Sequence, residues 1–295
     1  MKPGPKRILC LAACLLIGLV ALFVWKAWRP SEPVYQGKTL SAWVEQWQSN
    51  RIALTMFFDN PSRKAATYAR EEAQKAILQI GTNGIPYLLR LVRSEELATP
   101  SWLKRTLPDS WLERLGLEDA GGKINQIGSH GLYILGTNAS PAVPALMDLL
   151  SAELARSPID TKRIWLVMSP LSSMKDGADP AIPLLIECLT HTNRLVGREA
   201  ARSLSRFYDK PEIVVPALVN FLTLQNKSQQ PDRLDEEETI ISIGLFGTNA
   251  ASAAPALIGY LTDPDPAFRE AATNWLRRVD PSAAERAGIR IYKTR

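Results

Sequence analysis

The sequence predicts an all-α protein: an α-solenoid of about five two-helix repeats, preceded by one N-terminal transmembrane helix. Three observations predict it. A proline followed by an apolar run with helical spacing occurs five times, and a "GTN" turn precedes three of these runs. An uncharged apolar segment of membrane length lies near the start of the chain.

Residues 8–25, "ILCLAACLLIGLVALFVW", form that uncharged segment. Such a run comes close to the roughly 20 residues that a membrane-spanning helix needs. Basic residues flank it with a modest excess on the N-terminal side: Lys2, Lys6 and Arg7 before it, and Lys26 and Arg29 after it. This asymmetry favours a cytoplasmic N-terminus and a periplasmic or otherwise extracytoplasmic body. We therefore expect a membrane anchor at 1–29 and a linker at 30–34.

Two alternatives for this segment stay open at the sequence level. It could be a signal peptide that is cleaved, although its apolar run is long for one. It could also be a lipoprotein signal, because "LAAC" at 11–14 resembles the motif that ends at a lipidated Cys14. The only cysteine after the segment is Cys188, which we expect to be a buried packing residue.

The charge pattern excludes a basic nucleic-acid-binding face. The net charge is +5, and residues 1–34 alone contribute five basic side chains against one acid. The rest of the chain is therefore close to neutral, so the basic balance belongs to the membrane flanks and we expect no nucleic-acid partner.

The five proline-anchored runs each predict a helix with one apolar face, because their apolar residues recur at i, i+3, i+4 and i+7. A proline in the first helical turn costs little. The runs begin at Pro86, Pro144, Pro183, Pro216 and Pro255.

A further helix is expected before each run. In three units its apolar positions share one set of offsets, as in Ala69, Ala73, Ala76, Ile77 and Ile80. A glycine follows the upstream helix in the three "GTN" units, where a residue without Cβ can take the left-handed conformation that ends a helix. These glycines are Gly81, Gly136 and Gly247.

The segments "NRLVGREAARSL" (193–204) and "PDPAFREAATNWL" (264–276) resemble the first helix of bacterial HEAT repeats. With "YQGKTLSAWVEQW" (35–47) as a lead-in, the chain resembles a membrane-anchored bacterial HEAT-repeat protein. The resemblance implies a lead-in helical cap at 35–63, a repeat domain at 64–285 and a C-terminal tail at 286–295.

The resemblance also implies structural links between neighbouring repeats. It pairs Arg269 with Asp263 or Asp265 of the loop before its helix. Arg198 stands at the matching place of an earlier unit, where Asn193 replaces the acid.

An insert at about 94–122 interrupts the first repeat interval and contains "SWL-x-R" twice. Large aromatic residues and arginine are enriched in binding hot spots, so these side chains are candidate partner contacts. The alternative is an extra helix that packs back on the repeats. The candidates are Trp102, Arg105, Trp111 and Arg114.

The second helices of the repeats are expected to line an extended concave surface. Their predicted exposed residues are further candidate partner contacts: Tyr87, Arg90, Asp148, Glu187, Asn220 and Tyr260. The acidic run at 235–238 is expected to be a solvated first helical turn.

No catalytic or metal-binding motif is found. His130 and His191 lie in different repeats without metal-ligand spacing, and "GKT" at 37–39 lacks the earlier glycine of a phosphate loop. We expect no metal and no cofactor. The expected function is a non-catalytic, membrane-anchored scaffold that binds a protein or peptide. An enzyme or enzyme accessory like the phycobilin lyases, or a purely structural envelope protein, stay as alternatives, and the oligomeric state stays open.

Overall fold

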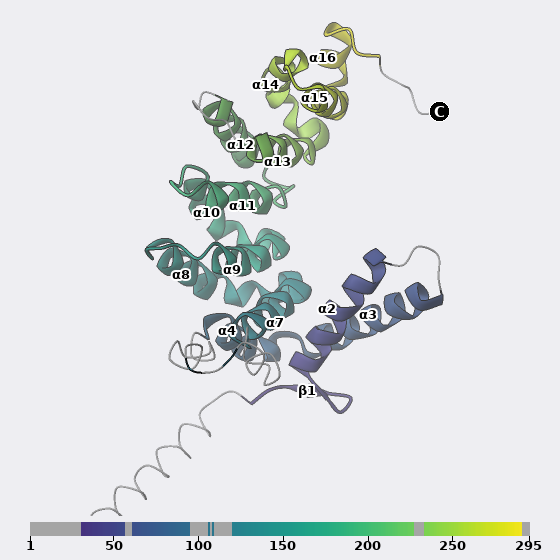
Figure 1. The fold of residues 1–295 in the computed structure, drawn as a ribbon, viewed down its shortest axis with the longest axis vertical. Coiled ribbons are helices and arrows are strands. Elements are labelled where there is room, and N and C mark those ends of the chain that lie inside the picture. Colours follow the sequence, from purple (N-terminus) through teal and green to yellow (C-terminus); the bar gives the residue numbers. More distant parts are fainter. Residues whose placement is uncertain are drawn as a thin grey trace, which may run out of the picture.

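The computed structural model describes residues 31–56, 61–94, 120–226 and 233–290, with the single positions 106 and 108. The predicted span at 8–25 and most of the insert lie outside this part of the chain. Among the described residues, no helix combines the length and the apolar character that crossing a membrane requires. The fold is mostly helical, in agreement with the predicted all-α class (Figure 1).

The helices follow a short hairpin of β1 (Val34–Tyr35) and β2 (Lys38–Thr39). They are α2 (Leu40–Met56), α3 (Pro61–Ile80), α4 (Ile85–Arg93), α7 (Ala120–Leu135), α8 (Val143–Leu154), α9 (Thr161–Ser173), α10 (Ile182–Leu189), α11 (Arg194–Leu204), α12 (Pro211–Asn226), α13 (Arg233–Gly244), α14 (Ala254–Gly259), α15 (Pro266–Val279) and α16 (Pro281–Arg286). Short 3-10 segments join several of them: η1 (Gly81–Gly84), η2 (Gly136–Ala142), η3 (Lys175–Ala181), η4 (Gly247–Ala253) and η5 (Tyr260–Thr262).

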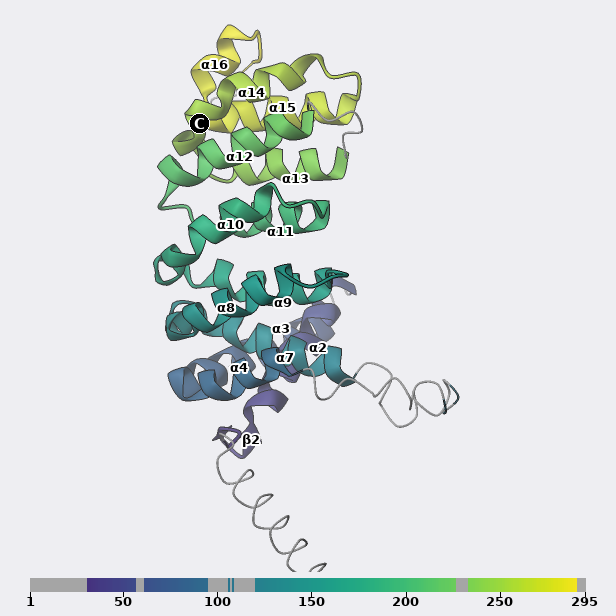
Figure 2. The same cartoon turned by 90° about the vertical axis from the view of Figure 1, so that its left-hand side faces the viewer.

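From α4 onward the helices form two rows that run the length of the molecule (Figures 1 and 2). The first row contains α4, α8, α10, α12 and α14. The second row contains α7, α9, α11, α13 and α15. Close pairs connect the rows, namely α4 with α7, α8 with α9, α10 with α11, α12 with α13, and α14 with α15. Helices of the second row also pack on one another in sequence order. One continuous apolar core therefore runs from Leu40 to Ala284.

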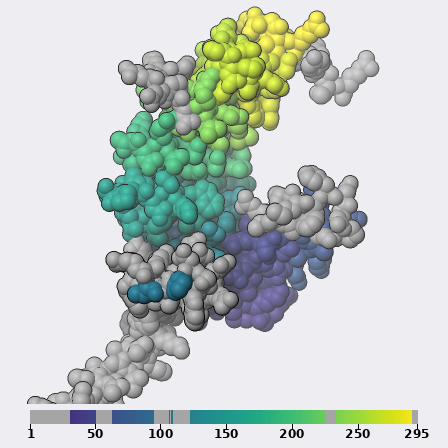
Figure 3. All heavy atoms as spheres, in the orientation of Figure 1, coloured from purple at the N-terminus to yellow at the C-terminus, as the bar shows by residue number. Residues whose placement is uncertain are grey.

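The helical hairpin of α2 and α3 stands out from this stack. Both helices contact α7 at the base, and in Figure 1 they rise beside the second row. The far end of the stack leans toward the same side (Figures 1 and 3). The molecule is therefore shaped like a hook. The second row and the α2–α3 hairpin form its inner side.

Apolar spacing determines which side of each helix is buried. In the first four proline-anchored runs the i, i+3 and i+7 positions are buried, as Ile85, Leu88 and Val92 are in α4, and the i+4 position is half-buried. In the last run the i and i+3 positions, Ala254 and Leu257, are also buried, but Ile258 at i+4 is exposed. Pro216 differs from the prediction, because α12 starts at Pro211 and the proline falls inside the helix.

Asx residues begin several helices of the second row. The side chain of Asp160 accepts hydrogen bonds from the backbone of Lys162 and Arg163, and Asn193 and Asp265 cap α11 and α15 in the same way. Each cap satisfies backbone N–H groups that have no partner within the helix.

The predicted role of the "GTN" glycines is confirmed. Gly81, Gly136 and Gly247 have φ values of 58°, 54° and 56°, which are in the left-handed region. Lys175, at φ 49°, occupies the same position at the end of α9. Gly136, Lys175 and Gly247 each precede the anchor proline of their run by eight residues. The motif thus recurs in a unit whose sequence does not contain it.

The lead-in segment was predicted to be helical, but it begins with the β1–β2 hairpin. Gln36 and Gly37 both have positive φ, which is the type I′ turn favoured in two-residue hairpins. The hairpin is held to α2 because Trp43 Nε1 donates to the carbonyl oxygen of Tyr35 at 3.1 Å.

Candidate interaction surface

A groove lies between the α2–α3 hairpin and the second row, on the inner side of the hook. It encloses about 250 Å³. We call it the inner groove. Its lining residues come from α2, α3, α7, α9 and α11, with Arg206 just beyond the end of α11. They are Trp47, Arg70, His130, Tyr133, Trp165, Ser169, Ser172, Glu199, Arg202, Ser203 and Arg206.

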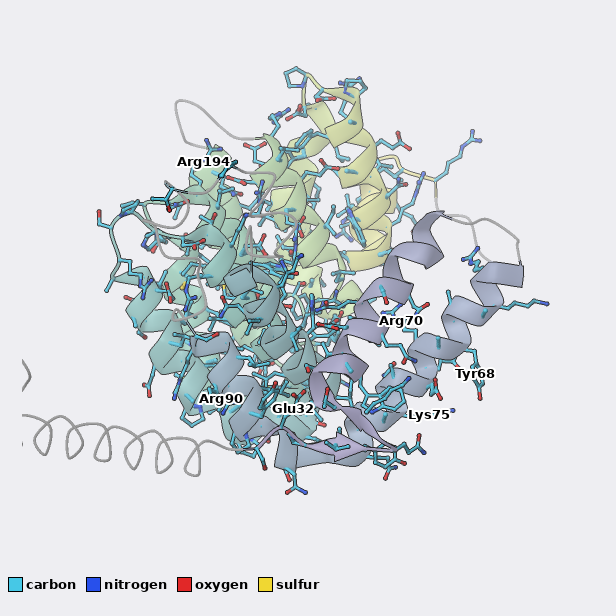
Figure 4. All side chains as sticks on the ribbon, turned by 60° about the horizontal axis from the view of Figure 1, so that its bottom comes forward. Glu32, Tyr68, Arg70, Lys75, Arg90 and Arg194 are labelled. Atoms are coloured by element: carbon cyan, nitrogen blue, oxygen red, sulfur yellow. The ribbon has the colours of Figure 1, made fainter. Side chains whose placement is uncertain are left out.

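A row of stacked side chains crosses the inner groove. The guanidinium carbon of Arg70 lies 4.4 Å from the ring centre of Trp47. The Trp47 ring is 5.9 Å from that of His130, and His130 meets Trp165 edge-on at 5.8 Å. Figure 4 shows Arg70 on the α2 side of α3, while Tyr68 and Lys75 lie along its outer edge. Four helices thus contribute one continuous row of aromatic and cationic side chains, in which Trp47 is buried.

The charged side chains of the groove differ in how they are paired. Arg202 donates from Nε and Nη2 to the two carboxylate oxygens of Glu238, both at 3.0 Å, and its Nη1 lies 3.5 Å from Glu199. Burial raises the pKa of Glu199, and the nearby arginines lower it only in part. Within the described part of the chain, neither Arg70 nor Arg206 forms an ion pair with a carboxylate.

A larger hollow of about 820 Å³ adjoins the groove at the N-terminal ends of α7, α9 and α11. Trp165 and Glu199 line both spaces, so they form the border between them. Most of the other lining is polar or charged: Ser94, Asn125, Gln126, Arg156, Asp160, Thr161, Lys162, Arg163 and Arg198, with Gly122, Leu166 and Leu195.

Ion pairs fix the helices of the second row. One pair joins this row to the first row, and others join two neighbouring helices within it. Glu153 of α8 is 1% exposed and accepts from Nε of Arg163 on α9 at 2.7 Å. Asp235 at the start of α13 lies 3.2 Å from Nε of Arg194 and 3.6 Å from Nη1 of Arg198 on α11. These pairs hold α9 and α11 in place, and with them the groove side chains that they carry.

The structure corrects the predicted first turn of α13. Asp235 and Glu236 were expected to be solvated, but they are 4% and 0% exposed. The reason is that arginines surround them: Arg194 and Arg198 reach Asp235, and Arg233 donates to Glu236 at 2.7 Å. A charge cluster in the sequence is buried here because the neighbouring layer supplies the opposite charge.

The expected pairing of Arg269 with a loop carboxylate is wrong in detail. Arg269 Nη1 donates to the backbone oxygens of Asp263 and Pro264, at 2.6 and 2.9 Å. The Asp263 carboxylate instead pairs with Arg233, and Asp265 caps α15. The acid and the arginine still belong to one inter-layer cluster, which includes Arg233 stacked 3.9 Å over Phe268.

The second helices of the repeats, which form the first row (α4, α8, α10, α12 and α14), do not line the inner side of the hook. This corrects the prediction that they form the concave surface. Tyr87 and Tyr260 are buried, at 8% and 4% exposure. Burial, then the charge of Glu32, raises the pKa of Tyr87. Burial, then the charge of Glu236, raises that of Tyr260. Both side chains are thus packed inside this chain and are not available to a partner.

The other candidates on these helices lie apart from the groove. Asp148, Glu187 and Asn220 are exposed on the first row, which faces away from the α2–α3 hairpin in Figure 1. Arg90 is half-buried, with its guanidinium carbon 4.9 Å from the Tyr87 ring centre, and it lies near Glu32 in Figure 4. The insert candidates Trp102, Arg105, Trp111 and Arg114 lie outside the described residues.

The described residues contain no cluster of three or more His, Cys, Asp or Glu side chains arranged to hold a metal ion. Cys188 is 2% exposed, in agreement with its predicted packing role. Burial, with the charge of Glu187, raises the pKa of its thiol to about 12, so the group stays protonated and unreactive at neutral pH.

Comparisons with known proteins do not assign this surface. The chain matches no model of a protein family, and no curated protein is significantly similar to it.

Sequence reasoning missed the inner groove because its aromatic side chains lie just beside the apolar stripes. Trp165 follows the buried Ile164, and Tyr133 follows the buried Leu132. The usable signal was a large aromatic residue at a helical position outside the core spacing. Trp47 gave no such signal, because it belongs to the apolar face of α2 and is 5% exposed.

Proposed function

We propose that this protein is a membrane-tethered scaffold of the HEAT-repeat type, without catalytic activity, that binds a protein or peptide in the inner groove. In this proposal residues 8–25 form the anchor and the stack of helix pairs projects from the membrane into the periplasm or another extracytoplasmic space. The repeated apolar spacing and the left-handed residue at the helix ends support the repeat type. The flanking basic residues support the orientation.

The observation that carries the binding role is the row formed by Arg70, Trp47, His130 and Trp165. Aromatic and arginine side chains dominate the binding energy of protein interfaces. Trp165 belongs to α9, which the buried Glu153–Arg163 pair joins to α8, and α2, α3 and α7 pack against one another at the base of the stack. A pre-organised surface of this kind loses little conformational entropy when a partner binds.

The size of the inner groove favours a polypeptide over a small molecule. The inner groove, at about 250 Å³, is smaller than the roughly 300–1,000 Å³ typical of small-molecule sites. The adjoining hollow, at about 820 Å³, lies within that range, so the distinction by size applies to the inner groove. An extended segment that crosses Trp165 would use both.

Affinity capture from solubilised membranes tests this proposal with the full-length chain as bait. The groove variant is Tyr133→Ala/Trp165→Ala, and the matched control is Tyr68→Ala/Leu78→Ala, at two exposed positions of α3 that do not line the groove. We expect the control to retain the partners of the parent chain and the groove variant to lose at least one. Retention of every partner by a folded groove variant would show that binding occurs elsewhere.

The insert needs a separate variant, because its candidate residues lie outside the described chain. Trp102→Ala/Trp111→Ala tests whether those tryptophans take part in binding. Loss of the same partners in the insert variant and the groove variant would indicate one joint surface. Loss in the insert variant alone would move the proposed binding site from the groove to the insert.

A further inference from the structure

The inner groove has an uncompensated positive charge beside its aromatic row. Arg70, Arg202 and Arg206 line it against a single carboxylate, Glu199. Arg202 is already held by both oxygens of Glu238. Arg70 and Arg206 have no carboxylate partner in the described chain, where Arg206 only contacts the hydroxyl group of Tyr208 at 3.5 Å.

These two arginines come from different parts of the chain. Arg70 belongs to α3 of the projecting hairpin, and Arg206 follows the last turn of α11 in the stack. The rings of Trp47, His130, Tyr133 and Trp165 line the same groove. A ligand that fits would thus offer negative charge to both arginines and a flat group to the rings between them.

We infer that the inner groove binds an extended acidic peptide segment in which carboxylate side chains flank an aromatic or proline ring. This inference rests on the proposed scaffold function and adds the chemistry of the ligand. The carboxylates pair with Arg70 and Arg206, since the planar guanidinium group matches a carboxylate geometrically. The ring packs on Trp165 and His130, which both line the groove.

The geometry favours a peptide over a nucleic acid. Sequence-independent binding of single-stranded nucleic acid combines stacking rings with a positively charged groove that tracks the phosphates. Here Glu199 lines the groove together with the arginines, and its charge would oppose a continuous line of phosphates. Separate carboxylates on a peptide can avoid that position.

Fluorescence anisotropy with the full chain in detergent micelles tests the inference. The probes are three short fluorescein-labelled peptides: one with Asp and Glu around a Trp-Pro pair, one with Lys at every acidic position, and one that keeps the acids but replaces Trp-Pro with Gly-Ser. A labelled oligothymidine of similar length is the fourth probe. We expect the first peptide to bind most tightly, with an affinity that falls as salt is raised.

Charge reversal identifies the residues involved. Arg70→Glu/Arg206→Glu is expected to weaken the acidic aromatic peptide by about tenfold or more, because it replaces two attractions with two repulsions. Lys75→Glu/Arg278→Glu changes the net charge equally at exposed positions outside the groove, and its affinity should match that of the parent chain.

Three results would overturn the inference. They are equal binding of the acidic and the basic peptide, equal affinity in the two charge-reversal variants, and tighter binding of the oligothymidine with loss on Arg70→Glu/Arg206→Glu. In each case affinity capture can still show partner loss in Tyr133→Ala/Trp165→Ala. The scaffold proposal would then stand while the ligand chemistry falls.

Discussion

Arg163 donates from Nε to Oε1 of Glu153 at 2.7 Å, and this bond joins α9 to α8 beneath the hollow that borders the groove. Glu153 is almost wholly buried, and Arg156 approaches its other oxygen at 3.2 Å. Trp165 stands two residues after Arg163 on the same helix. The position of a groove residue is therefore coupled to a buried ion pair.

Glu153→Ala should destabilise the stack strongly, because it removes the buried carboxylate that pairs with Arg163 and leaves a cavity in its place. Breaking a buried pair by removing one side costs about 3–5 kcal/mol. Urea unfolding followed by circular dichroism measures the change. Glu187→Ala, at an exposed acid on α10, is the control and should change stability by less than about 0.5 kcal/mol. Equal, small effects of both substitutions would contradict the structural role of the pair.

Lys175→Gly should stabilise the protein. Lys175 takes the left-handed conformation at the end of α9, which costs an L-residue with a side chain about 1–2 kcal/mol. Thermal unfolding should therefore shift upward in this variant.

Gly247→Ala is the opposite change at the equivalent position after α13. A Cβ there has no neighbouring atom within 4 Å, so the expected loss of about 1 kcal/mol comes from the backbone alone. A Lys175→Gly variant that unfolds at a lower temperature than the parent would show that the side chain compensates for its conformation.

Asp263→Asn should alter the pH dependence of stability. Burial raises the pKa of Asp263, but the hydrogen bond from Arg233, the Asp265 backbone N–H and nearby charges together lower it below its ordinary value of 3.8. An acid with a lowered pKa in the folded state stabilises the fold above that ordinary value and loses the contribution as pH falls through the lowered pKa.

Urea midpoints for parent and Asp263→Asn should thus differ at neutral pH and converge below about pH 4. Glu270→Gln, at an exposed acid on α15, should follow the parent curve. A constant difference between Asp263→Asn and the parent across the acidic range would contradict the ionised pair with Arg233.

The membrane orientation is tested by reporter fusions to the C-terminus. Alkaline phosphatase needs disulfide bonds that form in the periplasm, so a fusion to the full chain should be active if the body is extracytoplasmic. Replacing Lys2, Lys6 and Arg7 with Gln should reduce that activity, because it removes the charge excess before residues 8–25. An inactive fusion of the unaltered chain at normal expression would reverse the proposed orientation.

The sequence was sufficient for the local architecture because the physics involved is local. Helical spacing predicted the buried positions of α4 and α8, and glycine at a helix end predicted the left-handed residues of three units. A fourth left-handed residue, Lys175, was missed because it adopts that conformation against its own preference. Pro216 was misinterpreted because α12 begins one turn earlier than the repeat pattern suggests.

The candidate site was less predictable because it depends on how separate helices are arranged. The hairpin of α2 and α3 rises beside the second row, so the inner groove faces α7, α9 and α11 and not the second helices. Nothing in the local spacing of Tyr87 or Tyr260 indicates that these side chains are buried. The partners of Asp235 lie about one repeat away in sequence, which is why its burial was not anticipated.

The most direct test of the binding surface is site-specific photo-crosslinking in intact membranes. Benzoylphenylalanine replaces Tyr133 in the inner groove or, as the control, Tyr68 on the outer edge of α3. Both tyrosines are exposed, at 36% and 72%, so either position tolerates the larger ring. The account predicts a discrete protein adduct at position 133 that is absent at position 68. An adduct at position 68 with none at position 133 would contradict it.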